Sequence, residues 1–174
     1  MDSPSPAQNG SVFYAEDLVR KANSAGLHCA QIADNLPLEE LSTEERHALA
    51  EFADSRRVAI EVGARRMTPD HLARMIDVAA FFGSHVLRFV IDGPGFGPPV
   101  DEVVTVVREA LPRLREAGVK LAIENHDRLA AAEFLDHRQL RLVREVVDRV
   151  DLGFHVIQKA GHACTFAHHR GGDA

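Results

Sequence analysis

The stretch VAIEVGARRMTPDHLARMIDVAAFFGSHVLRFVID, residues 58–92, decides the fold. It begins with the apolar run Val58–Val62 and closes with a second apolar run, Val86–Ile91. Between the two runs, Thr68 followed by Pro69 has the pattern of a helix N-terminus, where a hydroxyl caps free amides and proline fits the first turn. The stretch therefore predicts a strand, a helix and a second strand in succession.

The same unit recurs along the chain. Further apolar runs occur at Leu27–Ala33, Val119–Ile123 and Val150–Val156, and successive runs start roughly thirty residues apart, which is the length of one βα unit. Amphipathic segments that predict helices separate the runs, at about 42–54, 69–83, 100–117 and 131–149. The sequence thus predicts an α/β fold with about five parallel βα units.

Local signals mark the ends of these helices. Ser42 and Glu45 have the spacing of a capping box, in which hydroxyl and carboxylate each satisfy a backbone amide. Gly83 and Gly118 are predicted to end two of the helices, because glycine readily adopts the left-handed backbone conformation found at helix C-termini. Pro112 falls inside the third predicted helix, where it is expected to kink it or loosen one turn.

Strands that alternate with helices leave two architectures, an open doubly wound sheet and a (β/α) barrel. The segment DGPGFGPP, Asp92–Pro99, lacks the Lys-Ser or Lys-Thr ending of a phosphate loop and does not fit the dinucleotide fingerprint, so an ordinary βα loop is expected. The missing nucleotide motifs favour the barrel. A complete barrel takes about 250 residues, and the 174 residues here predict a partial one.

Composition excludes several classes of protein. The net charge of −6 argues against nucleic acid as a partner, because such binding depends on clustered Lys and Arg. No apolar run approaches the roughly 20 residues that cross a bilayer, and the opening residues lack the features of a signal peptide, so a cytoplasmic location is expected. Cys29 and Cys164 have no CxxC spacing and predict neither a disulfide framework nor a zinc knuckle.

The candidate site lies in LAIENHDR, Leu121–Arg128. An apolar strand there ends on the polar residues Glu124, Asn125 and His126. The C-terminal ends of barrel strands are where α/β enzymes assemble their chemistry. Glu124 is therefore predicted as the central site residue. The alternative is a structural role, in which the Glu124 carboxylate caps a helix or accepts hydrogen bonds from backbone donors.

Three other side chains are candidate substrate contacts, each with a structural alternative. Glu61 shares the less bulky face of its strand, which suits a barrel lumen, or else it is solvated or locally paired. Arg88 points into the barrel towards a substrate oxygen or phosphate, or else it pairs with a buried carboxylate. Asn35, next to Asp34 at a strand end, contacts substrate or forms an ordinary turn.

Three segments, 28–42, 58–92 and 118–135, resemble the sugar phosphate isomerase/epimerase group of the xylose isomerase-like TIM barrels, a superfamily that also contains apurinic endonucleases. The sharpest pieces are QIADNLPL, IEVG and IENHD, and the similarity covers about residues 15–154. The resemblance implies that the apolar runs are the second to sixth strands of an eight-stranded barrel.

The same resemblance implies a divalent metal, manganese, magnesium or zinc, held at the C-terminal ends of the later strands. Glu124 matches the first metal-binding carboxylate, and His155 stands about where the second ligand, an Asp, would be. His126 would act beside Glu124 in catalysis or touch substrate, and Asn125 would touch substrate. In such a site the metal polarises the sugar while a carboxylate moves a proton between adjacent carbons.

The family pattern stops near Phe154, so we expect an atypical segment at 1–13, a partial barrel at 14–156 and a disordered tail at 157–174. The tail histidines, with Cys164, have no zinc-finger spacing. The expected function is a metal-dependent isomerase or epimerase of small carbohydrates. Alternatives are a non-catalytic barrel remnant acting by association and, less favoured, an abasic-site endonuclease. Open barrel edges predict self-association into a homo-oligomer.

Overall fold

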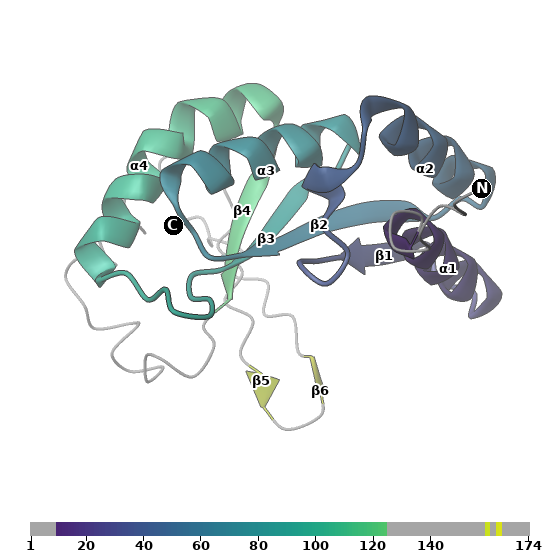
Figure 1. The fold of residues 1–174 in the computed structure, drawn as a ribbon, viewed down its shortest axis with the longest axis horizontal. Helices are drawn as coiled ribbons and strands as arrows, with labels where there is room; N and C mark the ends of the chain where they lie inside the picture. Colours follow the sequence, from purple (N-terminus) through teal and green to yellow (C-terminus); the bar gives the residue numbers. More distant parts are fainter. Residues whose placement is uncertain (1–9, 125–158, 161–162, 165–174) are drawn as a thin grey trace, which may run out of the picture.

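The computed structural model describes residues 10–124, 159–160 and 163–164. Helices and strands alternate through the first of these ranges (Figure 1). In chain order they are α1 Gly10–Ser24, β1 Cys29–Ile32, the 3-10 helix η1 Leu38–Glu40, α2 Thr43–Ser55, β2 Ala59–Arg65, α3 Pro69–Phe81, β3 Val86–Val90, α4 Val100–Ala117 and β4 Lys120–Glu124. Two short strands, β5 Lys159–Ala160 and β6 Ala163–Cys164, pair antiparallel in the tail.

Strands β1 to β4 form a parallel sheet whose spatial order follows the sequence. A doubly wound sheet reverses its strand order at a switch point and carries helices on both faces. Here the order does not reverse, and α2, α3 and α4 lie along one side of the sheet (Figure 1). The predicted partial TIM barrel is therefore confirmed.

The predicted strands agree closely with those observed. Four of the five apolar runs contain a strand, and the fifth, Val150–Val156, lies outside the described residues. Strand β2 continues to Arg65, three residues beyond the apolar run, because Gly63 and Ala64 keep its ladder with β3. Helix α1 and the 3-10 helix η1 were not predicted.

The helix ends follow the predicted capping chemistry. The Ser42 hydroxyl accepts from the Glu45 amide at 3.2 Å, and the Ser42 amide donates to the Glu45 carboxylate at 2.8 Å, which completes the capping box. Gly118 ends α4 with a φ of 65°, the left-handed region that favours glycine. Pro112 lies inside α4, on its exposed side.

The glycine-rich loop after β3 closes on itself. The amides of Gly93 and Phe96 each donate to the other residue's carbonyl at 2.9 Å, and Gly95 turns the chain between them with a φ of 67°. Amides that cradle a phosphate must be free to point at it. These two are already paired, in agreement with an ordinary βα loop.

The core lies between the sheet and the helices. Alternate strand residues point to opposite faces of a sheet, and those on the helix side are all buried. They are Ala30, Ile32, Ile60, Val62, Ala64, Leu87, Phe89, Leu121 and Ile123. Helices α3 and α4 cover them with Leu72, Met75, Ile76 and Leu114, and α1 packs against α2 and β1.

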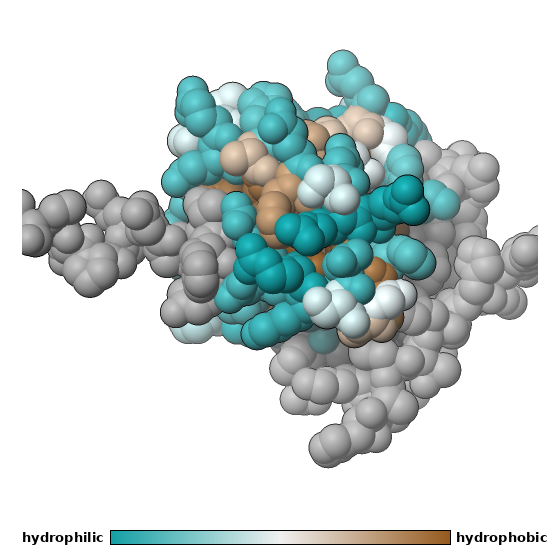
Figure 2. Space-filling model, turned by 90° about the vertical axis from the view of Figure 1, so that its right-hand side faces the viewer, coloured by the Kyte–Doolittle hydropathy of each residue, from teal (hydrophilic) through white to brown (hydrophobic). Residues whose placement is uncertain are grey.

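The outer surface is mainly polar. On the side of the molecule that carries α1 and α2, small apolar areas are separated by hydrophilic side chains (Figure 2). Among the residues whose exposure is described, Leu27 is the one large apolar side chain that is exposed. None of the described helices combines the length and apolar character needed to cross a membrane.

Candidate functional site

The candidate site lies on the face of the sheet opposite the helices, called here the open face. Parallel pairing places Glu61 beside Gln31, Arg88 beside Gly63 and Ala122, and Glu124 beside Val90. In a barrel this face lines the lumen. In contrast to the helix side, it carries side chains of both charges, and Arg65 and Glu124 stand at the C-terminal ends of their strands.

Glu124 ends β4 and is buried, with 8% of its side chain exposed, and Arg88 from β3 faces it with 19% exposed. Both Nε and Nη2 of Arg88 contact the same carboxylate oxygen, Oε2. A buried charge is tolerated when it is paired and hydrogen-bonded. Of the two roles expected for Arg88, pairing with a buried carboxylate is the one observed.

Gly63 on the neighbouring strand makes room for this guanidinium. A Cβ placed on Gly63 would lie 3.3 Å from Nη1 of Arg88 and 3.2 Å from Cβ of Ala33, both closer than ordinary contacts. A larger residue at position 63 would therefore push against Arg88. The glycine lets Arg88 lie across the open face from β2 towards β4.

Glu61 lies on the open face, as predicted, and is half-buried. Its carboxylate accepts a hydrogen bond from Gln31 Nε2 at 3.4 Å, so it is locally paired at the same time. The thiol of Cys29 lies close by, and burial followed by the negative charge of Glu61 raises the pKa of that thiol. This part of the open face thus offers polar oxygen and nitrogen atoms, and the exposed Lys120 at the start of β4 adds a cation to the same face.

The C-terminal ends of β1 and β2 add another ion pair. Nη1 of Arg65 and Oδ2 of Asp34 form an ion pair across 3.7 Å, and both side chains are about 40% exposed. Within the described part of the chain, the buried Nε of Arg65 has no hydrogen-bond partner. Asn35 follows as an exposed turn residue. Arg65 was not predicted as a site residue, because it lies three residues beyond the apolar run that predicted the strand.

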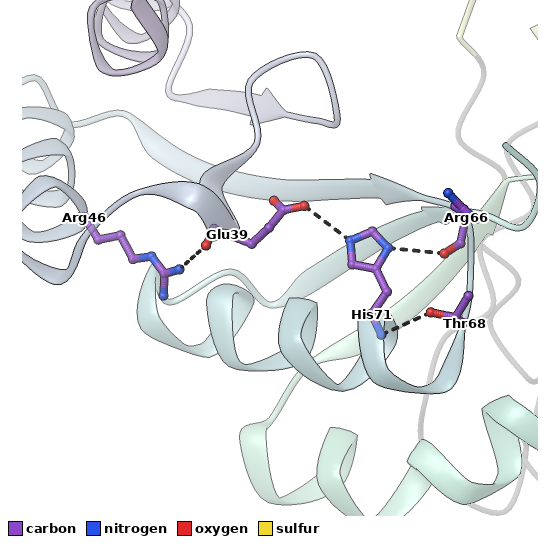
Figure 3. A network of polar contacts seen from close by, with 5 residues as sticks. All are labelled: Glu39, Arg46, Arg66, Thr68 and His71. Carbon is purple, nitrogen blue, oxygen red and sulfur yellow. Dashed lines mark hydrogen bonds and ion pairs between the residues drawn. The ribbon is translucent and has the colours of Figure 1, made fainter. Parts of the chain in front are cut away.

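A second polar network joins the loops next to this site (Figure 3). His71 in the first turn of α3 contacts Glu39 through Nε2 at 3.3 Å and the carbonyl of Arg66 through Nδ1 at 3.2 Å. Its ring also packs edge-on against Phe89 of β3. Both partners of the ring nitrogens are acceptors, so only the doubly protonated imidazolium satisfies both.

The electrostatics of this network agree with a charged histidine. The hydrogen bond to Glu39 raises the pKa of His71, and the bond from His71 lowers the pKa of Glu39. Arg46 of α2 holds the backbone of the same turn by donating to the carbonyls of Leu38 and Glu39. The network was not predicted from the sequence, although Thr68-x-x-His71 places His71 beside the helix cap.

The remaining predicted site residues, Asn125, His126 and His155, lie outside the described residues. The same holds for His162 in the tail. Within the described ranges, no three His, Cys, Asp or Glu side chains come together in a way that could hold a metal ion. Glu124 is the one predicted metal ligand among them, and Arg88 already engages its carboxylate. The described residues therefore do not fit a divalent cation.

Comparison with known proteins identifies barrels of the expected kind. No protein-family model matches the chain. A curated 3-oxo-isoapionate decarboxylase from Pectobacterium atrosepticum is 24% identical over 134 residues, which cover 77% of this chain and 46% of that protein. The chain thus spans less than half of this relative.

Two solved structures show the fold. A D-psicose 3-epimerase crystallised with D-fructose superposes with a TM-score of 0.56 at 13% identity, over 65% of this chain and 47% of the epimerase. A xylose isomerase domain protein from Planctomyces limnophilus gives 0.58 at 15% identity, over 79% and 57%. At these identities the two neighbours establish the fold of this chain alone.

Proposed function

We propose that the open face binds a small sugar or related polyhydroxy carbonyl compound and removes a proton from the carbon next to the carbonyl. The proton is then returned to the adjacent carbon, as in an isomerase, or to the opposite face of the same carbon, as in an epimerase. The observation that carries the proposal is the buried Glu124 carboxylate at the C-terminal end of a barrel strand. Barrel chemistry is performed at this end. Proteins of the same fold include a D-psicose 3-epimerase.

Glu124 would take the proton from the carbon next to the carbonyl, because a positioned carboxylate can act as a general base. Negative charge then develops on the carbonyl oxygen. The guanidinium of Arg88 lies beside Glu124 and would stabilise that oxygen with its donors. Gln31, Glu61 and Asn35 would contact substrate hydroxyls around the rim, together with the predicted contacts Asn125 and His126.

A manganese, magnesium or zinc ion was expected at this site, and it would polarise the carbonyl and a hydroxyl of the sugar. Its further predicted ligand, His155, lies outside the described residues. Because the described residues do not fit the ion, the steps above are assigned to Glu124 and Arg88 alone.

The proposal is tested by proton exchange with solvent. The full chain is incubated in deuterated water with a panel of ketoses, aldoses and their phosphates, and deuterium at the carbon next to the carbonyl is followed by NMR. We expect incorporation into at least one compound, lost in Glu124→Gln and kept in Glu51→Gln. Glu51 is an exposed carboxylate of α2 and serves as the matched control.

A non-catalytic barrel remnant is the second candidate, and one observation favours it. The carboxylate of Glu124 is already paired with Arg88, as in a structural ion pair. Exchange with none of the compounds would favour the remnant over the isomerase. Exchange that persists in Glu124→Gln would overturn the role of Glu124 as the base.

A further inference from the structure

We propose that Arg88 is the resident cation of Glu124 and keeps divalent metal ions from this carboxylate. The inference concerns binding, so it goes beyond the proposed reaction and holds with or without it. It follows from the geometry of one ion pair and from the donor atoms around it.

The geometry of the contact leaves little room for a metal ion beside Oε2 of Glu124. Two nitrogens of Arg88 converge on one oxygen of Glu124, from an adjacent and paired strand. Arg88 and Glu124 are fixed by the sheet ladder, in which Val90 of β3 pairs with Glu124 of β4. A metal ion within coordination distance of that oxygen would lie a few Å from the guanidinium, and two positive charges at that separation repel strongly outside bulk water.

Moving the Arg88 side chain away from Glu124 would cost free energy. With 19% of its side chain exposed, it is largely removed from water, and leaving Glu124 would separate two desolvated charges. Gly63 lies against the outer nitrogen, Nη1, and shapes the space in which the guanidinium lies. An entering metal would have to displace a cation that the fold has already positioned.

The described residues offer few other ligands for a metal ion bound to Glu124. A stable site for manganese or zinc needs several oxygen or nitrogen donors. Among the described residues, the carboxylate of Glu61 is bonded to Gln31 and that of Asp34 faces Arg65. Neither forms a three-residue ligand group with Glu124. A metal ion would gain one carboxylate ligand, and the buried ion pair between Arg88 and Glu124 would be broken.

The experiment is a titration of the full chain with manganese chloride, followed by calorimetry. We expect no saturable site that depends on Glu124 in the wild-type chain. Removing the competing charge in Arg88→Gln should let manganese bind Glu124 with water in its other coordination positions, weakly but at least about tenfold tighter than in the wild type, a common size for coupling between neighbouring groups. The double variant Arg88→Gln/Glu124→Gln should lose the gain. Arg113→Gln, which removes an exposed arginine from an ion pair, should behave as wild type.

Two further variants keep the test decisive if Arg88→Gln is poorly folded. Arg88→Lys retains a positive charge and should still exclude manganese. Gly63→Ala retains Arg88 but crowds Nη1, so it should raise the affinity for manganese in the same direction as Arg88→Gln. A rise in unfolding temperature on adding manganese reports binding independently, because a ligand of the folded state stabilises it.

Wild-type binding of manganese that is lost in Glu124→Gln and unchanged in Arg88→Gln would overturn the proposal. Unchanged affinity in both Arg88→Gln and Gly63→Ala would also overturn it. Neither result depends on isotope exchange, so failure of this inference and failure of the proposed function are distinguishable.

Discussion

The two faces of the four-stranded sheet are built on different principles. On the helix side every strand residue is apolar and buried. On the open face the same strands carry Gln31, Glu61, Arg65, Arg88 and Glu124. Because successive side chains along a strand point to opposite faces of the sheet, each strand sequence determines the composition of both faces. The helix side supplies the free energy of folding, and the open face holds the polar groups that could do chemistry.

The difference also shows where charge is tolerated. Glu124 and Arg88 are accepted on the open face because each neutralises the other. On the helix side, charge approaches the core at the end of the sheet, where His71 and Glu39 form their own pair.

The largest effect is expected on the helix side. Phe89 is fully buried between β3 and the helices, so Phe89→Ala should lower the free energy of unfolding by about 3–5 kcal/mol through lost burial and a cavity. Val86 lies on the open face of the same strand and is half-buried, and Val86→Ala should cost about 1 kcal/mol. Urea unfolding of both variants measures the difference. Equal costs would mean that the open face is also a packed core.

The next effect concerns the buried pair on the open face. Arg88→Met leaves Glu124 without its counter-charge and should lower the free energy of unfolding by about 3 kcal/mol. Replacing both partners, in Arg88→Met/Glu124→Leu, should recover most of that loss, because no unpaired charge remains. Urea unfolding again provides the measurement. A double variant as unstable as Arg88→Met would show that the pair contributes more than mutual neutralisation.

The fold could be predicted from the sequence because its signals are local and repeated. Apolar runs about one βα unit apart, the capping box at Ser42 and the glycine at Gly118 each act over a few residues. Helix α1 was not predicted, although Ala15, Leu18, Val19 and Ala22 have the spacing of one apolar helix face and pack against the core. The 3-10 helix η1 was not predicted, because hydrogen bonds from the Arg46 side chain hold its backbone.

The site was predictable residue by residue and not as an arrangement. The strand pattern placed Glu61, Arg88 and Glu124 towards a lumen. It could not decide whether Arg88 meets substrate or Glu124, because that depends on the register between β3 and β4 and on the space left by Gly63. The His71–Glu39 bond joins residues 32 positions apart, and no local pattern encodes it.

The third prediction concerns pH and the charged pair at the edge of the helix side. The pKa of His71 is raised above its ordinary value of 6.5, so its stabilisation is complete below about that pH and is lost as pH rises through the raised value. Glu39 has a lowered pKa, so its contribution is complete above 4.5 and is lost as pH falls through the lowered value.

The free energy of unfolding should therefore fall by about 1 kcal/mol more in the wild type than in His71→Gln as the solution is made alkaline, a size expected for a partly screened pair. Urea unfolding across the pH range measures this difference. His47→Gln removes an exposed histidine of α2 and should follow the wild-type curve. Parallel curves for the wild type and His71→Gln would show that His71 is not held as a cation.

The smallest effect on stability is expected for an exposed ion pair of the same type as the buried Arg88–Glu124 pair. Arg113 of α4 donates to Asp77 of α3 in three contacts between 2.5 and 3.0 Å, yet the two side chains are 50% and 59% exposed. Water already solvates both charges, so Arg113→Ala should move the midpoint of thermal unfolding by no more than about 2 °C and less in high salt. Scanning calorimetry beside Arg88→Met gives a direct comparison of one ion pair in two settings. A shift as large as that of Arg88→Met would mean that contact geometry, and not removal from water, determines what these pairs contribute.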